Sequence, residues 1–128
     1  MVTDFEDYTS ELTQFEREIL VPRIAGGLKY AVGRECAVTN KRIRETLRRE
    51  GYGKNYPKGE IPETTIRACI HHIRVHDLVP MLLAGSKGYY IARELVEAER
   101  YFASLKEREN SIKEVREALG RQMTGRLF

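Results

Sequence analysis

The sequence predicts a mainly α-helical protein with one small β-hairpin and a long helix near its C-terminus. Three observations lead to this fold class. Apolar residues recur at helical spacing in three stretches before residue 76. A run of extended character with two glycines and a proline follows, LVPMLLAGSKGYYIA. Residues 93–119 then contain neither glycine nor proline, and the total of 128 residues suits one domain with an appendage.

The composition is that of an ordinary globular protein. Charged residues make up 32% and hydrophobic residues 41% of the chain. The first ten residues, MVTDFEDYTS, are acidic where a signal peptide is basic and then apolar. Cys36 and Cys69 lie far apart and are typical of reduced thiols. We therefore expect a cytoplasmic protein that does not enter a membrane.

Positive charge is concentrated in the middle of the chain. Residues 1–28 hold two basic and six acidic residues, residues 29–91 hold twelve and six, and residues 92–128 hold eight and seven. A net charge of +6 in the middle segment attracts phosphates. A net charge of +6 over this segment is equally compatible with an ordinary solvated surface that binds no phosphate.

The first helix is predicted to begin at the capping pattern Thr13-x-x-Glu16 and to continue through KYAV at residues 29–32. Its apolar stripe contains Leu12, Phe15, Ile19, Leu20, Ile24 and Leu28. Pro22 lies inside this helix and is expected to kink or split it, because proline has no N–H to donate. Residues 1–9 have no periodicity, and we expect a flexible start there, with docking of Phe5 and Tyr8 as the alternative.

The second helix is predicted from Thr39 or Asn40, as its N-cap, to Gly51, with Ile43 and Leu47 facing inward. Its outer face is basic and either contacts phosphates or is simply solvated. The residues of that face are Lys41, Arg42, Arg44, Arg48 and Arg49.

The segment GYGKNYPKGEI, residues 51–61, is a loop by composition. It separates the second predicted helix from the third, and it is longer than the turn that joins two helices in the simplest helix-turn-helix proteins. Tyr52 and Tyr56, with Lys54 and Lys58, either follow a nucleic-acid backbone or belong to a mobile insertion. For the two tyrosines, the mobile insertion is the preferred interpretation.

A third helix is predicted over residues 63–76. Pro62 suits its first turn, and Ile66, Ile70 and Ile73, with Cys69, form one apolar stripe. Four small, polar or basic residues are predicted to face away from that stripe and to suit a nucleic-acid groove. They are Thr64, Arg67, Ala68 and His71.

A hairpin is predicted after this helix. LVPMLL, residues 78–83, reads as a strand that Pro80 confines to an edge. AGSKG supplies a tight reversal with Ser86 and Lys87 at its tip, and GYYIA forms the second strand. Helix, strand, turn and strand in this order predict a winged helix-turn-helix over residues 10–92, with a wing at residues 83–91.

A long helix is predicted over residues 93–120, followed by a frayed tail at residues 121–128. Its apolar residues alternate at spacings of three and four, with Glu109 and Arg116 interrupting the seam. Either this helix joins two chains into a dimer or it folds back on its own domain, and Ser111-x-x-Glu114 leaves open a second helix starting there. The predicted dimer contacts are Leu105, Ile112 and Leu119.

The stretch RACIHHIRVHDLVPMLLAGSKGYYIA resembles the winged-helix DNA-binding domain of biotin-repressor-type regulators. The resemblance covers residues 37–92 and includes the Gly88-Tyr89 step that closes the wing. It implies a recognition helix that contains an arginine. The chain is too short for the ligase domain of those regulators and has no matching nucleotide loop.

The leading functional hypothesis is a double-stranded DNA-binding protein, a transcriptional regulator or a replication accessory protein of a phage or other mobile element. Arg67 is the expected base reader, because arginine contacts guanine O6 and N7 with two hydrogen bonds. The alternative is a winged-helix module for protein–protein interaction without specific DNA binding. The predicted DNA contacts are Asn40, Lys41, Arg44, Thr64, Arg67, Ala68, His71, Ser86 and Lys87.

The sequence gives no support for catalysis. It lacks a Walker-type loop, a G-x-S-x-G elbow and an H-E-x-x-H motif. Cys69, His71, His72 and His76 fall on different faces of one helix, so no metal site is expected. We also expect no cofactor and no small-molecule ligand.

Overall fold

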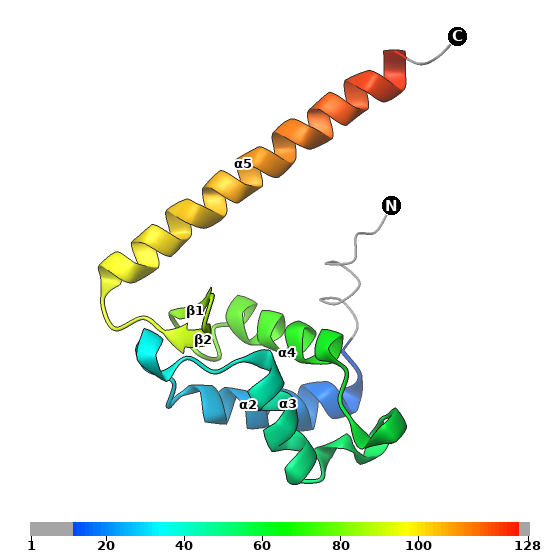
Figure 1. Cartoon of the computed structure of the whole chain (residues 1–128), viewed down its shortest axis with the longest axis vertical. Helices are drawn as coiled ribbons and strands as arrows, with labels where there is room; N and C mark the ends of the chain where they lie inside the picture. The colour runs from blue at the N-terminus through cyan, green and yellow to red at the C-terminus, as the bar shows by residue number, and fades with distance from the viewer. Residues whose placement is uncertain (1–11, 126–128) are drawn as a thin grey trace. The chain divides into compact units, whose positions relative to one another are not determined.

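The computed structural model describes residues 12–125, which divide into two units, one ending at Arg93 and one beginning at Glu94. The fold is mainly α-helical with one antiparallel hairpin and a long C-terminal helix, as predicted (Figure 1). The expected flexible segment 1–9 lies outside the described residues. The principal elements are a π-helical segment (Glu16–Leu20), α2 (Val21–Leu28), α3 (Asn40–Arg49), α4 (Glu63–Val75), β1 (Leu82–Gly85), β2 (Gly88–Ile91) and α5 (Leu95–Gly125).

The predicted capping box is present at the start of the first helix. The Glu16 backbone N–H donates to Thr13 Oγ1 at 3.1 Å, and the Thr13 N–H donates to Glu16 Oε1 at 2.9 Å. Each side chain therefore satisfies a backbone N–H of the other residue. Glu16 is buried, which is unusual for a carboxylate and indicates further partners.

The disturbance expected at Pro22 takes the form of a π-helical segment. The Val21 N–H donates to Glu16 O, five residues back, immediately before the proline that cannot donate. The wider turn brings Leu20 and Val21 into the core and leaves Ile19 exposed, so the predicted inward position of Ile19 is wrong. The helix also ends at Leu28 and does not continue through residue 32.

The second helix, α3, has the predicted ends. Thr39 is its N-cap and accepts a hydrogen bond from the Arg42 N–H at 3.1 Å. Gly51, with a φ of 87°, ends it in the left-handed conformation that glycine adopts at low cost. Glu50 at the last turn forms a bidentate pair with Arg23 of α2, at 2.7 and 2.8 Å.

Residues 51–61 form short 3-10 turns, Tyr52–Asn55 and Pro57–Gly59, that are anchored to the core. The Tyr56 hydroxyl donates to Glu16 Oε2 at 2.7 Å, and the rings of Tyr56 and Phe15 lie 6.4 Å apart. The interpretation of the tyrosines as part of a mobile insertion is therefore wrong. Burial and the bond to Glu16 raise the pKa of Tyr56.

Helix α4 has the predicted bounds to within one residue and the predicted apolar stripe. Ile66, Cys69 and Ile73 are each 0% exposed. The helix ends in a Schellman motif, in which Asp77 has a φ of 58° and the Leu78 N–H donates to Ile73 O at 3.0 Å.

One predicted position on α4 is wrong. Ala68 was expected on the outer face, but it is buried at 5% exposure and belongs to the core. The reason is that α4 packs against both α2 and α3, so its buried arc is wider than the isoleucine stripe alone. The small side chain of alanine permits this close approach.

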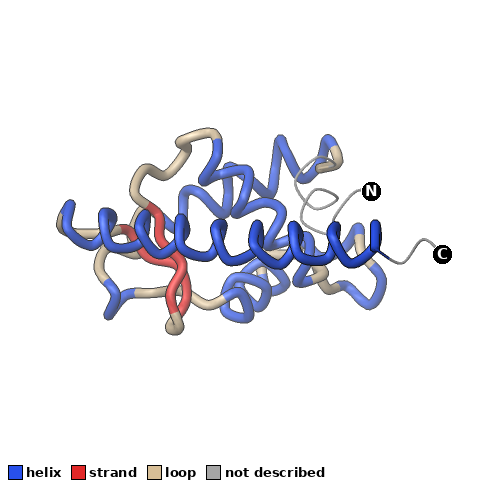
Figure 2. Tube along the Cα trace, turned by 90° about the horizontal axis from the view of Figure 1, so that it is seen from above, coloured by secondary structure: helices blue, strands red, loops and turns tan. Residues whose placement is uncertain are grey.

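The hairpin is shorter at its start than predicted. Strand β1 begins at Leu82, and Pro80 lies in the preceding turn together with Met81, which has a φ of 63°. Proline fits that turn because its φ is fixed and no ladder N–H is required there. Leu82 pairs with Ile91 and Gly85 with Gly88, so Ser86 and Lys87 form a two-residue tip (Figure 2).

Strand β2 has a second neighbour, the segment at residues 31–38. Val38 and Tyr89 exchange two backbone hydrogen bonds, at 2.8 and 2.9 Å. A Cβ on Gly88 would lie 2.4 Å from the Val38 carbonyl oxygen, which explains the glycine there. Val38 is half-buried against the core and pairs with Tyr89 as an isolated bridge.

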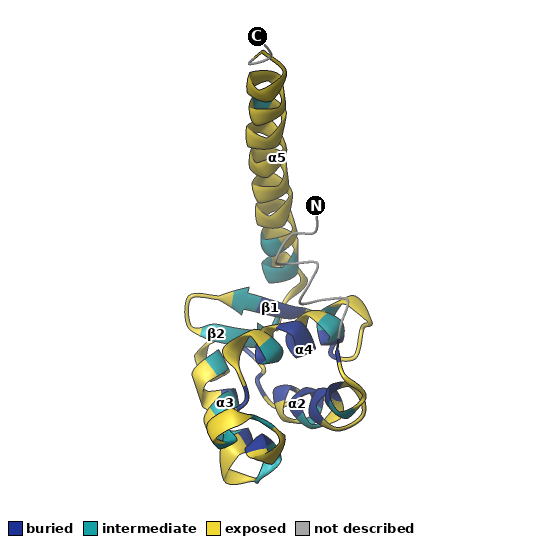
Figure 3. Cartoon of the chain, turned by 90° about the vertical axis from the view of Figure 1, so that its right-hand side faces the viewer, coloured by how far each residue is buried: buried dark blue, intermediate teal, exposed yellow. Residues whose placement is uncertain are grey.

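The second unit contains α5, one unbroken helix of 31 residues. The alternative of a second helix beginning near Ser111 is therefore wrong. The helix also continues to Gly125, past the predicted start of the frayed tail; residues 126–128 are outside the described part. None of its residues is buried (Figure 3). Between residues 12 and 125, no helix is long and apolar enough to cross a membrane.

Candidate nucleic-acid interface

The outer face of α4 carries three of the predicted base-contacting side chains. Thr64, Arg67 and His71 are all exposed and follow one another at helical spacing. Arg67 donates from its NH2 group to Glu63 Oε1 at 2.6 Å, an i, i+4 ion pair that is about half exposed. The guanidinium is thus held along the helix surface by a neighbouring carboxylate.

The electrostatic surroundings of His71 favour its neutral form. Desolvation, followed by the positive charges of Arg74 and His76, lowers its pKa below the ordinary value of 6.5. A neutral imidazole has one donor and one acceptor nitrogen, so it can take either role at a base edge. Ala68, by contrast, is buried and cannot contact a ligand in this structure.

The start of α3 contributes fewer accessible groups than the sequence suggested. Lys41 is exposed, but Asn40 is half-buried with both atoms of its amide shielded and without a hydrogen-bond partner among the described residues. Its predicted role as a DNA contact is therefore not supported by its position. The capping role falls to Thr39, which turns the side chain of the following residue inward.

Arg44 is also constrained. Its guanidinium lies 3.6 Å from Glu60, which in turn lies 4.0 Å from Arg48. These side chains line a hollow of about 420 Å³ between α3 and the start of α4. Because the hollow contains both signs of charge, it is a weaker attractor for phosphate than the basic sequence of α3 implies.

The tip of the hairpin exposes Ser86 and Lys87, as predicted. The structure adds Arg34, whose NH2 group lies 3.4 Å from Ser86 Oγ. Sequence reasoning missed Arg34 because 52 residues separate it from Ser86. The backbone pairing of residues 31–38 with β2, which includes the bond from the Gly33 N–H to Ile91 O at 2.9 Å, brings this arginine to the hairpin.

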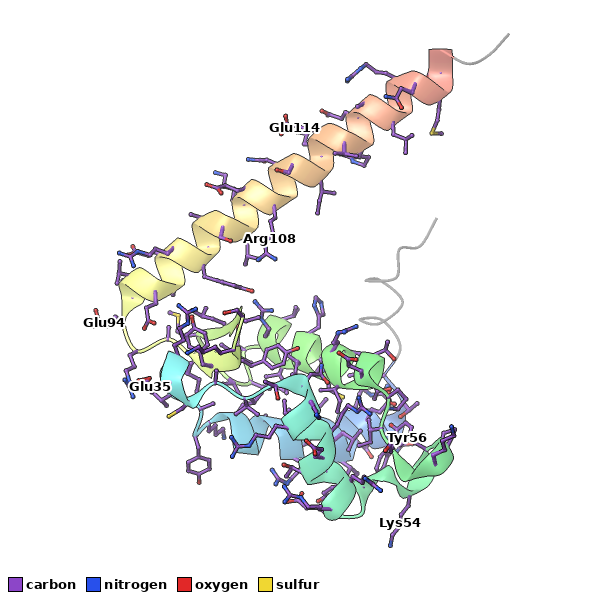
Figure 4. All side chains as sticks on the ribbon, in the orientation of Figure 1. Glu35, Lys54, Tyr56, Glu94, Arg108 and Glu114 are labelled. Atoms are coloured by element: carbon purple, nitrogen blue, oxygen red, sulfur yellow. The ribbon has the colours of Figure 1, made fainter. Side chains whose placement is uncertain are left out.

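The hairpin and α4 belong to the same unit and lie beside each other in two views (Figures 1 and 3). The exposed face of α4 and the basic tip of the hairpin are therefore available on one domain. A different exposed lysine, Lys54, projects from the anchored turns at residues 52–55 (Figure 4).

The remaining candidate groups do not form a site with these residues. Cys69 is buried, and burial raises the pKa of its thiol to about 12, so it is a protonated core residue. In the described part of the chain, no three His, Cys, Asp or Glu side chains are arranged to hold a metal ion. The predicted dimer contacts Leu105, Ile112 and Leu119 belong to α5, in the second unit, and are all exposed.

A second hollow, of about 480 Å³, lies between α2 and α3. Its walls include Ile24, Leu28 and Ile43, which are core residues with at most 8% exposure. Exposed side chains, among them Tyr30, Cys36 and Arg42, form another part of its wall.

Comparison of the chain with protein-family models, with curated proteins and with solved structures found no match.

Proposed function

We propose that the first unit is a winged helix-turn-helix domain that binds double-stranded DNA, with α4 in the major groove and the hairpin as the wing. The observation that carries this proposal is the exposed row Thr64, Arg67 and His71 on a helix whose opposite side is fully buried. A helix anchored in this way presents a rigid, polar face of the width that a major groove admits.

In this proposal, Arg67 reads a guanine. Its ion pair with Glu63 has two consequences. The pair holds the guanidinium extended, and it must open or rotate when the arginine donates to guanine O6 and N7. Both groups are about half exposed, so opening the pair costs little. Thr64 and the neutral His71 then contact neighbouring base edges.

The hairpin tip and the start of α3 supply the phosphate contacts. Lys87 and Arg34 offer two positive charges at the tip, and Lys41 offers a third from α3. Such contacts fix the position of a protein on the duplex without carrying sequence information. The unpaired thiols of Cys36 and Cys69 suit a reducing compartment such as the cytoplasm. Regulation of transcription, or assistance in replication of a mobile element, is the role that we propose for such binding.

A second candidate function is a protein–protein interaction module. It is favoured by Glu60 and Glu63, which already partner three arginines of the same face: Arg44, Arg48 and Arg67. Three apolar side chains at the end of α4 and in the turn that follows are also exposed, namely Val75, Leu78 and Met81. A partner protein, unlike DNA, would cover these apolar groups.

Binding of the full chain to a random duplex library at two salt concentrations separates the two functions. We expect enrichment of particular sequences and a steep loss of affinity with salt, which together indicate base readout and phosphate contacts. The Lys87→Ala variant is expected to reduce the salt dependence, whereas Lys29→Ala, at an exposed lysine beyond α2, serves as the charge-matched control. If the chain retains duplexes without enriching any sequence, the attraction is nonspecific. If the chain retains no duplex, the protein–protein interaction module is favoured.

A further inference from the structure

Within residues 94–125 of the second unit, α5 is the only helix or strand, so no second element of that part covers its apolar seam. The helix is 31 residues long, and none of its residues is buried. Helices in proteins gain most of their stability from packing an apolar face against another element. A helix of this length with no buried residue therefore indicates a partner. The exposed fractions of Phe102, Ile112 and Leu119 are 71%, 66% and 53%.

The seam of α5 follows a heptad repeat in which two charged residues, Glu109 and Arg116, interrupt the apolar positions. Steps of three and four residues alternate from Leu95 to Met123. The first position of each heptad, called a, and the fourth, called d, face a partner helix. The a positions are Leu95, Phe102, Glu109, Arg116 and Met123, and the d positions are Ala98, Leu105, Ile112 and Leu119.

Glu109 and Arg116, the two charged residues of the seam, discriminate between a parallel and an antiparallel pair of α5 helices. In a parallel pair of identical helices, a positions face each other, so Glu109 would meet Glu109 and Arg116 would meet Arg116. Both contacts join like charges at a partly desolvated seam, which is unfavourable. The flanking positions do not discriminate, because Arg108 approaches Lys113 of the other helix in the parallel pair and Lys106 approaches Lys113 in the antiparallel pair.

In an antiparallel pair, an a residue shares its layer with a d residue of the other helix. When Phe102 faces Leu119 of the second copy, Glu109 faces Ile112 and Arg116 faces Leu105. Glu109 of one helix and Arg116 of the other then occupy adjacent layers, where their long side chains can form an ion pair. Symmetry creates this pair twice.

We propose that α5 is an antiparallel dimerisation helix, which pairs with α5 of a second copy through Phe102–Leu119 layers and two Glu109–Arg116 ion pairs. The length of the helix supports this register independently. Aligning Phe102 with Leu119 also aligns Val96 with Gly125, so that nearly all of Leu95–Gly125 overlaps. This inference does not depend on DNA binding by the first unit.

The arrangement sets the separation of the two domains. Each first unit is joined to the N-terminal end of its α5, so an antiparallel pair attaches the two domains at opposite ends. A helix of 31 residues is about 46 Å long at about 1.5 Å per residue. The dimer would therefore engage two separated binding sites and not one compact palindrome.

Disulfide cross-linking of the full chain tests the orientation. In a Cys36→Ser background, the buried Cys69 stays in place. An equimolar mixture of Arg108→Cys and Val115→Cys chains is expected to form a mixed disulfide, because these flanking positions are neighbours only in the antiparallel register. Arg108 lies on the surface of α5 (Figure 4). A mixture of Arg108→Cys and Lys113→Cys chains is the matched control for the parallel pair; preferential cross-linking there overturns the proposal.

Charge exchange tests the ion pairs. Glu109→Arg and Arg116→Glu are each expected to weaken dimerisation about tenfold or more, since either change converts two attractive contacts into two repulsive ones. The double variant is expected to recover the affinity of the natural chain. Sedimentation equilibrium measures the constants. A monomeric natural chain at tens of micromolar, or single variants that dimerise as tightly as the natural chain, contradicts the proposal.

Discussion

The first unit and α5 use the same sequence signal with opposite structural results. In α4, isoleucines at helical spacing are completely buried, because α2 and α3 of the same unit cover them. In α5, a seam that Glu109 and Arg116 interrupt contains no buried residue. Periodicity therefore predicts that a helix has a buried face, but not whether the covering partner belongs to the same chain.

This difference separates two tasks. The first unit has its own core, so its exposed face on α4 is free to recognise a ligand. Helix α5 has no buried residue, and assembly is the role that we propose for it. The following predictions test whether stability, recognition and assembly divide in this way.

The largest effect is expected from Ile66→Ala in the core of the first unit. Ile66 is 0% exposed, and removal of its side chain is expected to lower the free energy of unfolding by about 2–5 kcal/mol. Ile112→Ala, at an exposed position of α5, is the matched control and should leave unfolding of the first unit nearly unchanged. Urea unfolding of the full chain measures the free energy of unfolding of both variants. Equal losses of free energy would contradict the separation between a stabilising core in the first unit and an exposed α5.

Arg67→Ala is expected to weaken binding to the preferred duplex by about 1–3 kcal/mol while leaving binding to unrelated DNA almost unchanged. The reason is that a bidentate contact to guanine carries sequence discrimination. Titration of both duplexes measures the difference. The control is Arg49→Ala, at an exposed arginine in the last turn of α3. If Arg67→Ala weakened binding to both duplexes equally, Arg67 would be a phosphate contact.

Tyr56→Phe is expected to lower the free energy of unfolding by about 1–2 kcal/mol, because it removes a hydrogen bond to the buried carboxylate of Glu16. Tyr52→Phe, at the other half-buried tyrosine of these turns, is the control. Thermal or urea unfolding compares the variants. A loss no larger than that of the control would mean that the bond contributes little.

The local features of the fold could be predicted from the sequence. The capping box of Thr13 and Glu16, the glycine that ends α3, and the inward isoleucines of α4 all depend on residues within a few positions of each other. The mainly α class with a hairpin and a long final helix follows from these local patterns. Resemblance to a winged helix remains an interpretation that awaits the DNA-binding measurements.

Contacts between distant residues could not be predicted in the same way. Tyr56 and Glu16 are 40 residues apart, so the composition of a loop concealed an anchored turn. Arg34 reaches Ser86 through the backbone pairing of residues 31–38 with β2. Ala68 is buried because two helices approach α4, which a single-helix projection cannot reveal.

The smallest effect is expected from Lys87→Ala at the hairpin tip. The change should weaken binding similarly for all duplexes and reduce the slope of log affinity against log salt by about one unit. Fluorescence titrations at several salt concentrations measure the slope. If the slope of log affinity against log salt were unchanged in the variant, the hairpin would not contact DNA through Lys87.

The most direct test of the account is to map the DNA-binding surface by NMR, using the ¹⁵N-labelled full chain and an enriched duplex. We expect the amide signals with the largest shifts to belong to residues 63–71 of α4 and to the Ser86–Lys87 tip. The signals of the buried side of α4 and of α5 should change little. Shifts concentrated at Val75, Leu78 and Met81, or no shifts on α4, would contradict DNA recognition by this face.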